Sequence, residues 1–101
     1  MYNVGEYGQS IYFNVGEDVS LNTNELILCK PDGTELTKTA LVGTTDFTTT
    51  TKGLFSANQY VFYQVVEGDL DVAGQWKFRV ISTTSTNVKK KTDWQKAIVK
   101  D

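Results

Sequence analysis

The chain of 101 residues contains no histidine, one cysteine and one proline, and these absences exclude several classes of protein. Without histidine it cannot form a Ser–His or Cys–His nucleophile pair or an imidazole metal ligand. The single Cys29 cannot form a disulfide within the chain, which excludes a disulfide-stapled secreted module. Because Cys29 follows the apolar run Leu26–Leu28, we expect it to be a small buried side chain rather than a reactive thiol. The sequence therefore predicts neither an enzyme nor a cofactor.

The sequence also lacks a membrane span and a signal peptide. No segment approaches the ~20 apolar residues needed to cross a bilayer. The segment Met1–Tyr7 has neither a basic stretch nor an apolar h-region. If Met1 is the native initiator, we expect the chain to be made in the cytosol and to leave it only by assembly or lysis.

Charge of one sign does not dominate, since ten basic and twelve acidic residues give a net charge of −2. The overall charge gives no electrostatic reason to expect a nucleic-acid partner. Three successive lysines, Lys89–Lys91, could contact phosphate or an acidic partner, but such a run is usually solvated. The sequence therefore predicts no nucleic acid and no membrane among the partners.

What the chain has in abundance is period-two alternation of apolar and polar residues, which predicts strands. In Gln75–Ser82, for example, we expect Trp76, Phe78 and Val80 to face the core. Fourteen threonines, which are β-branched, favour the same pleated backbone. About seven strands and no long helix predict an all-β fold with antiparallel sheets packed as a sandwich. The predicted strands are Gln9–Val15, Asn24–Lys30, Glu35–Val42, Thr45–Thr50, Gln59–Val66, Gln75–Ser82 and Thr92–Lys100, the last of which also fits helical spacing.

Turn residues separate these strands. Pro31–Thr34 combines a proline, an aspartate and a glycine, which is typical of a tight turn between antiparallel strands. We expect Glu67–Gly74 to be a crossover turn with one helical turn at Asp69–Ala73, and Ser82–Lys91 to be a polar loop.

Acidic and hydroxyl side chains are candidate binding groups. Glu67, Asp69 and Asp71 could supply oxygen ligands to calcium, but three carboxylates in one turn do not make the twelve-residue calcium loop. We favour a turn in which Asp69 caps the helical turn, and we predict no metal site. Glycosidase chemistry is disfavoured because a domain this small rarely supplies the necessary cleft. We expect the run Thr48–Thr51 to be an edge strand with its hydroxyls outward.

Four aromatic residues are candidates for contacts with a partner: Tyr2, Tyr7, Tyr12 and Trp94. Tyr12 lies on the polar face of its predicted strand and is the best candidate for an exposed ring. Exposed rings either stack on sugars or anchor protein–protein contacts, and the sequence leaves both uses open. We expect Tyr2, Tyr7 and Trp94 to be buried by partners rather than by their own domain.

The segment Gly74–Phe78 resembles the start of strand F in immunoglobulin-like domains, where an acidic turn precedes glycine, an aromatic residue and a core residue. Trp76 stands at the usual tyrosine position and Phe78 at the usual cysteine. The chain therefore departs from the extracellular animal type, because it has no cysteine pair for the intersheet disulfide. Tryptophan also cannot reproduce the hydroxyl hydrogen bond of the tyrosine corner.

The order of segments across residues 9–82 is similar to small immunoglobulin-like structural domains of tailed bacteriophages, in particular the N-terminal domain of baseplate upper proteins. That domain anchors a receptor-binding protein to the phage tail. The segments that carry the resemblance are Ile11–Val15, GEDVSL at Gly16–Leu21, ELILCKPDGTE at Glu25–Glu35, and EGDLDVAGQWKFRV at Glu67–Val80.

The resemblance implies a single immunoglobulin-like antiparallel β-sandwich of about seven strands over residues 1–101. It implies a non-enzymatic virion structural protein, in the tail, neck or baseplate or decorating the capsid, that folds in the bacterial cytoplasm. We expect docking to other virion proteins, as a homo-oligomer in a symmetric assembly, through edge strands and the segments Met1–Gln9 and Ser82–Asp101. The alternative is a carbohydrate-binding or host-adhesion module that binds a host glycan through exposed aromatic rings.

Overall fold

A computed structural model of the chain describes residues 2–50 and 53–101. These residues form eleven strands and no helix, so the prediction of an all-β fold is confirmed. The strands are β1 (Tyr2–Asn3), β2 (Ser10–Asn14), β3 (Thr23–Cys29), β4 (Glu35–Thr39), β5 (Leu41–Val42), β6 (Phe47–Thr49), β7 (Gly53–Phe55), β8 (Tyr60–Gln64), β9 (Gly74–Thr83), β10 (Lys89–Lys91) and β11 (Gln95–Lys100).

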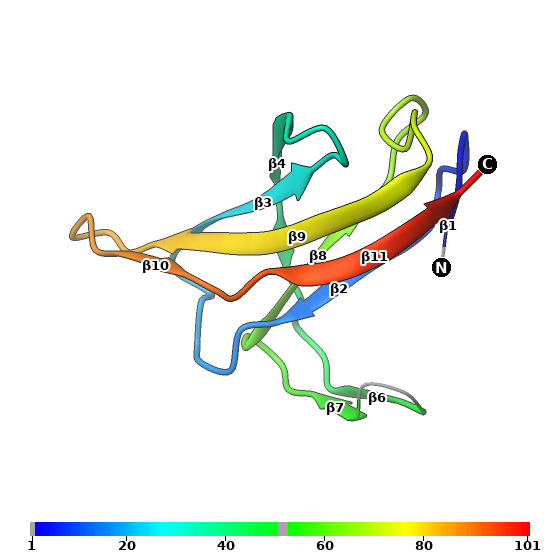
Figure 1. Cartoon of the computed structure of the whole chain (residues 1–101). Coiled ribbons are helices and arrows are strands. Elements are labelled where there is room, and N and C mark those ends of the chain that lie inside the picture. The colour runs from blue at the N-terminus through cyan, green and yellow to red at the C-terminus, as the bar shows by residue number, and fades with distance from the viewer. Residues whose placement is uncertain (1, 51–52) are drawn as a thin grey trace.

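In the described part of the chain these strands make three sheets (Figure 1). The large sheet has the order β1–β11–β9–β3–β4, with β10 paired to the end of β9, and it curls into a half-barrel. A three-stranded sheet has the order β2–β8–β5, and β6 and β7 form a separate two-stranded ribbon. The pairing of β1 with β11 is parallel, whereas the other pairings are antiparallel. The large sheet is therefore mixed and curled, so the all-β class is confirmed, whereas the arrangement is not clearly the simple antiparallel sandwich that we expected.

The parallel pairing joins the two ends of the described chain. Tyr2 lies beside Val99 and Asn3 beside Lys100. The Val4 N–H then donates to the Lys100 carbonyl at 2.7 Å. A two-residue strand is too short to show alternation, so sequence patterning could not indicate β1.

The hairpin between β3 and β4 is formed as its turn residues predict. The Lys30 N–H donates to the Thr34 carbonyl, and the Asp32 carboxylate accepts a hydrogen bond from the Thr34 N–H at 2.9 Å. Gly33 has a φ of 92°, a conformation that is open to glycine and strained for other residues. The turn fixes the register in which Leu28 lies opposite Leu36.

Two expectations about turns are wrong. The segment Asp69–Ala73 contains no helical turn, because the Asp69 carboxylate bonds back to Tyr63 and Val66 rather than capping a helix. Ser82–Lys91 is not simply a loop, because β9 continues to Thr83 and β10 returns beside it. The turn between them includes Asn87, which has a φ of 66° and so supplies the left-handed residue that closes it.

The predicted strand Thr92–Lys100, which also fitted helical spacing, is a strand in the structure, β11.

Cys29, expected to be buried, is half-buried instead. The register places Cys29 opposite Lys77 on the outer face of the large sheet, one position beyond the inward-facing Leu28. Its Sγ lies 3.7 Å from the Lys30 carbonyl oxygen.

The main core lies between the large sheet and the three-stranded sheet. Trp76, Phe78 and Val80 of β9 are buried there, as the alternation predicts. From the facing sheet, Ile11 and Phe13 of β2 belong to the same cluster. The Trp76 ring is fully buried, and its Nε1–H donates to the Val72 carbonyl at 3.0 Å. That bond satisfies the one polar group of the ring and ties the preceding loop to the core.

A second apolar cluster forms on the opposite face of the three-stranded sheet, where the β6–β7 ribbon covers it. We call its members the aromatic cluster: Tyr12, Phe47, Phe55, Tyr60 and Phe62. The Phe47 and Phe55 rings are stacked, with centroids 4.8 Å apart. Thr48 and Thr50 are exposed on this ribbon, as expected of the threonine run, whereas Thr49 is half-buried and Thr51 lies outside the described residues.

Gly43 makes the aromatic cluster sterically feasible. A Cβ added at this position would lie 1.8 Å from the Tyr60 ring, so even alanine cannot be accommodated without movement. The Gly43 N–H donates to the Tyr60 carbonyl, and the Tyr60 hydroxyl donates to the Thr45 carbonyl at 2.8 Å. Hydrogen bonds at the backbone and at the hydroxyl of Tyr60 therefore keep its ring against Gly43.

We predict that Gly43→Ala lowers the free energy of unfolding by about 1–3 kcal/mol, because the added methyl group displaces the Tyr60 ring. Urea denaturation measures the change, and the exposed neighbour Thr44→Ala serves as the control with a change within about 0.5 kcal/mol. In the double variant with Tyr60→Leu, the loss should be smaller than the sum of the two single losses. Additive losses would show that the clash with Tyr60 is not the cause.

Candidate docking site

The structure does not gather the four aromatic candidates into one site. Tyr2 and Tyr7 line a shared hollow at the N-terminal end of the chain. Tyr12 belongs to the aromatic cluster, and Trp94 precedes β11, where it contacts Arg79. The residues therefore mark three separate places on the surface.

Tyr2 is partly buried by its own domain, whereas we expected a partner to cover it. Its ring meets Phe78 edge to face, with centroids 6.4 Å apart. Burial, assisted by the nearby Glu6 carboxylate, raises the pKa of the Tyr2 hydroxyl. Tyr7 fits the expectation better, because 59% of its surface is exposed.

Tyr12 and Trp94 are each partly used in internal contacts. The Tyr12 side chain is 37% exposed, but its ring packs on Phe47 and Phe55 of the ribbon. The Arg79 guanidinium carbon lies 4.2 Å from the centre of the Trp94 ring, a cation–π contact. Glycan binding by these rings stays a prediction.

A groove runs along β2, between the three-stranded sheet and β10 and β11 of the large sheet. We call it the seam groove. It consists of three hollows of about 380, 470 and 300 Å³, each of which is lined by residues of both sides. Gln95, at the start of β11, lines all three. Ile11 and Phe78 line the first hollow and supply apolar surface.

On one side of the seam groove, β2 directs unpaired backbone groups outward. Val15 donates to the Gln59 carbonyl and Gln9 accepts from the Val65 N–H, so these odd-numbered positions bond toward the β8 side. Backbone direction alternates along a strand. Tyr12 and Asn14 therefore turn their N–H and C=O groups away from β8, where β2 is the outermost strand of its sheet.

On the other side, β11 has the same property over its first part. The Lys100 carbonyl accepts from the Val4 N–H on the side away from β9. Lys96 and Ile98, an even number of residues earlier, direct their backbone groups the same way. The parallel register places Tyr2 beside Val99, so β1 already covers the Ile98 carbonyl. The backbone groups of Lys96 have no strand beside them among the described residues.

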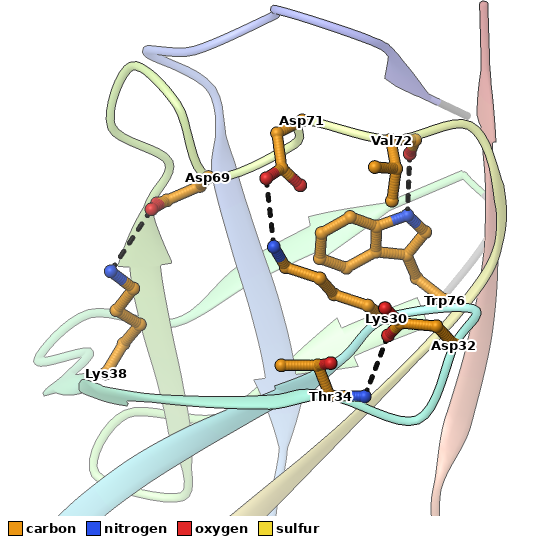
Figure 2. A network of polar contacts seen from close by, with 8 residues as sticks. All are labelled: Lys30, Asp32, Thr34, Lys38, Asp69, Asp71, Val72 and Trp76. Atoms are coloured by element: carbon orange, nitrogen blue, oxygen red, sulfur yellow. Dashed lines mark hydrogen bonds and ion pairs between the residues drawn. The ribbon is translucent and has the colours of Figure 1, made fainter.

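The predicted carboxylate group around Gly68 proves to be structural. Asp69 is buried, accepts hydrogen bonds from the Tyr63 hydroxyl and the Val66 N–H, and lies 3.1 Å from the Lys38 ammonium (Figure 2). Asp71 instead forms an ion pair with Lys30 at 2.9 Å. Within residues 2–50 and 53–101, no cluster of three or more acidic or cysteine side chains could hold a metal ion.

The environment of Asp69 changes two pKa values. Burial alone would raise the pKa of the Asp69 carboxyl. The hydrogen bonds from Tyr63 and Val66 and the charge of Lys38 outweigh burial, so this pKa is lowered. Burial and the hydrogen bond to Asp69 raise the pKa of the Tyr63 hydroxyl.

Comparisons with protein-family models, with curated proteins and with solved structures found no match for this chain. The described residues contain no helix that is long and apolar enough to cross a membrane.

We predict that Asp69→Asn lowers the free energy of unfolding at pH 7 by about 1.5–3 kcal/mol, the range for hydrogen bonds to a charged group. Because the folded-state pKa of Asp69 is lowered, its ionised form stabilises the protein above the unfolded-state value of about 3.9. This contribution is lost as the pH falls through the folded-state pKa.

Urea denaturation at neutral pH and at about pH 3 tests this sign, since the difference between the two proteins should shrink in acid. Asp71→Asn is the matched control, because its ion pair with Lys30 is exposed and contributes at most about 1 kcal/mol. A difference between wild type and Asp69→Asn that is independent of pH would contradict the assignment.

Proposed function

We propose that the chain is a non-enzymatic structural protein of a bacteriophage virion, built on an immunoglobulin-like sandwich, and that it docks by strand addition. In this proposal an extended segment of a neighbouring virion protein lies in the seam groove and pairs with β2. The observation that carries the proposal is the free edge of β2, which borders one groove with the uncovered first part of the β11 edge. The resemblance across residues 9–82 supports the virion setting.

The backbone of the seam groove favours an extended ligand. The outward N–H and C=O groups of Tyr12 and Asn14 recur at every second residue, which is the spacing that an added strand requires. Backbone hydrogen bonds of this kind provide affinity without demanding a particular sequence. A strand edge left open in this way is a template for pairing with another chain.

The side-chain lining of the seam groove adds selectivity. One hollow is lined by Tyr2, Ile11, Phe78 and Ala97, so alternate residues of the added strand would find an apolar surface. The hollow at the other end is polar, with Glu17, Lys90 and Asp93 among its lining residues. A segment that is apolar at one end and polar at the other fits this groove best.

The test follows the chain into virus particles released by a bacterium that carries its gene. We expect the wild-type protein to co-purify with particles at a fixed ratio to the major structural protein, detected by antibody. Asn14→Pro removes an N–H that faces the groove and leaves the bonds toward the β8 side in place, so incorporation should fall about tenfold or more. Wild-type protein that remains entirely outside the particles would overturn the proposal.

Two further variants make this test specific. Asn14→Ala keeps the backbone N–H and should be incorporated like the wild type. Gln95→Trp changes an exposed side chain of β11, fills the groove where its three hollows meet, and should block incorporation without altering the backbone of β2. If Gln95→Trp folds and is incorporated normally, the seam groove is not the docking site.

A further inference from the structure

One part of the outer face of the large sheet, formed by β9, β10 and β11, is basic, although the whole chain carries a net charge of −2. Glu25 of β3 and Glu35 of β4 lie on the remaining part of that face. On β9, the buried Trp76, Phe78 and Val80 face the core, so the residues between them face outward. Residues that lie directly opposite on β10 and β11 share that face. Every charged side chain that these three strands turn outward is cationic. We call this surface the basic face: Lys77, Arg79, Lys89, Lys91, Lys96 and Lys100.

No member of the basic face forms an ion pair with another described residue. In the part of the chain that the structure describes, the ion pairs are formed by Lys30, Lys38 and Lys90, none of which belongs to this face. Five of the six members are exposed and Arg79 is half-buried beneath its contact with Trp94. Because β9 spans ten residues, the basic face extends for about 30 Å.

A group of acidic side chains lies in the loops at one end of the fold. We call this surface the acidic end: Glu6, Asp32, Glu67 and Asp71. The loops are adjacent, since the Gly5 N–H donates to the Leu70 carbonyl and Lys30 pairs with Asp71. Figure 2 shows Asp32 and Asp71 in neighbouring loops of this region.

We infer that the basic face binds the acidic end of a second copy of this chain. The two surfaces differ, so the contact is heterologous: each copy uses its basic face for one neighbour and its acidic end for the other. Such a contact generates rings or filaments rather than a closed twofold dimer. It involves a surface separate from the seam groove, so it can operate whether or not the chain belongs to a virion.

A second copy is favoured over a nucleic acid as the occupant. A copy brings an acidic surface of limited size that matches a patch of six cations. A nucleic acid would be repelled by the acidic remainder of a chain whose pI is about 5.0. The only tryptophan near the basic face, Trp94, is already occupied by Arg79 and is half-buried rather than free to stack on a base.

Sedimentation velocity over a range of protein and salt concentrations tests the inference. We expect the wild-type protein to self-associate at about 0.01 M salt and to dissociate at about 0.5 M, because screening acts on exposed charges. Lys77→Gln/Lys96→Gln should raise the dissociation constant about tenfold or more. Thr48→Asp/Thr50→Asp is the matched control, because it changes the net charge by the same amount on the distant β6–β7 ribbon.

Complementary charge reversal identifies the partner surface. Lys96→Glu alone and Glu67→Lys alone should each self-associate weakly, whereas an equimolar mixture should recover hetero-association, since each variant still offers one intact surface and the reversed pair also matches. A wild-type protein that stays monomeric at low salt overturns the inference. So does a wild-type monomer that binds a fluorescent single-stranded oligonucleotide through Lys77 and Lys96, which would assign the basic face to nucleic acid. Neither result bears on particle incorporation through the seam groove, which Asn14→Pro tests.

Discussion

The ladder along β9 is the constraint on which the rest of this structure depends. One edge of β9 pairs with β3, and the other pairs first with β11 and then with β10. Its register decides which residues enter the core and which face outward. A shift of one residue would bring Lys77 and Arg79 into the core and expose Trp76, so the burial of Trp76 fixes the whole sheet. The basic face is the other consequence of that register.

The aromatic cluster plays a corresponding part on the smaller sheet. β2 would otherwise expose Tyr12 on one side while Ile11 and Phe13 fill the core on the other. The β6–β7 ribbon covers that outer side, so the faces of β2 are occupied and its free edge is what remains available. This division explains why the seam groove lies along an edge rather than across a face.

Local patterns in the sequence predicted much of the fold but little of the candidate site. Alternation located the strands and the inward side chains of β9, and Pro31–Thr34 marked the hairpin between β3 and β4. Both signals depend on neighbours in the chain. The parallel pairing of β1 and the seam groove depend on segments almost the whole chain apart. Net charge was misleading for the same reason: Lys96 and Lys77 are distant in sequence but lie directly opposite in the sheet. The Asp69 contacts likewise required the position of Lys38, thirty-one residues away.

The parallel pairing of β1 with β11 has a mechanical consequence. If tension is applied between Tyr2 and Lys100, the two strands are pulled in opposite directions along their length. Hydrogen bonds between them, such as the one from Val4 to Lys100, are then loaded in shear and share the force instead of opening one after another. An antiparallel arrangement of the same two ends would peel apart from one side. The fold is thus oriented to resist stretching along the line that joins its ends.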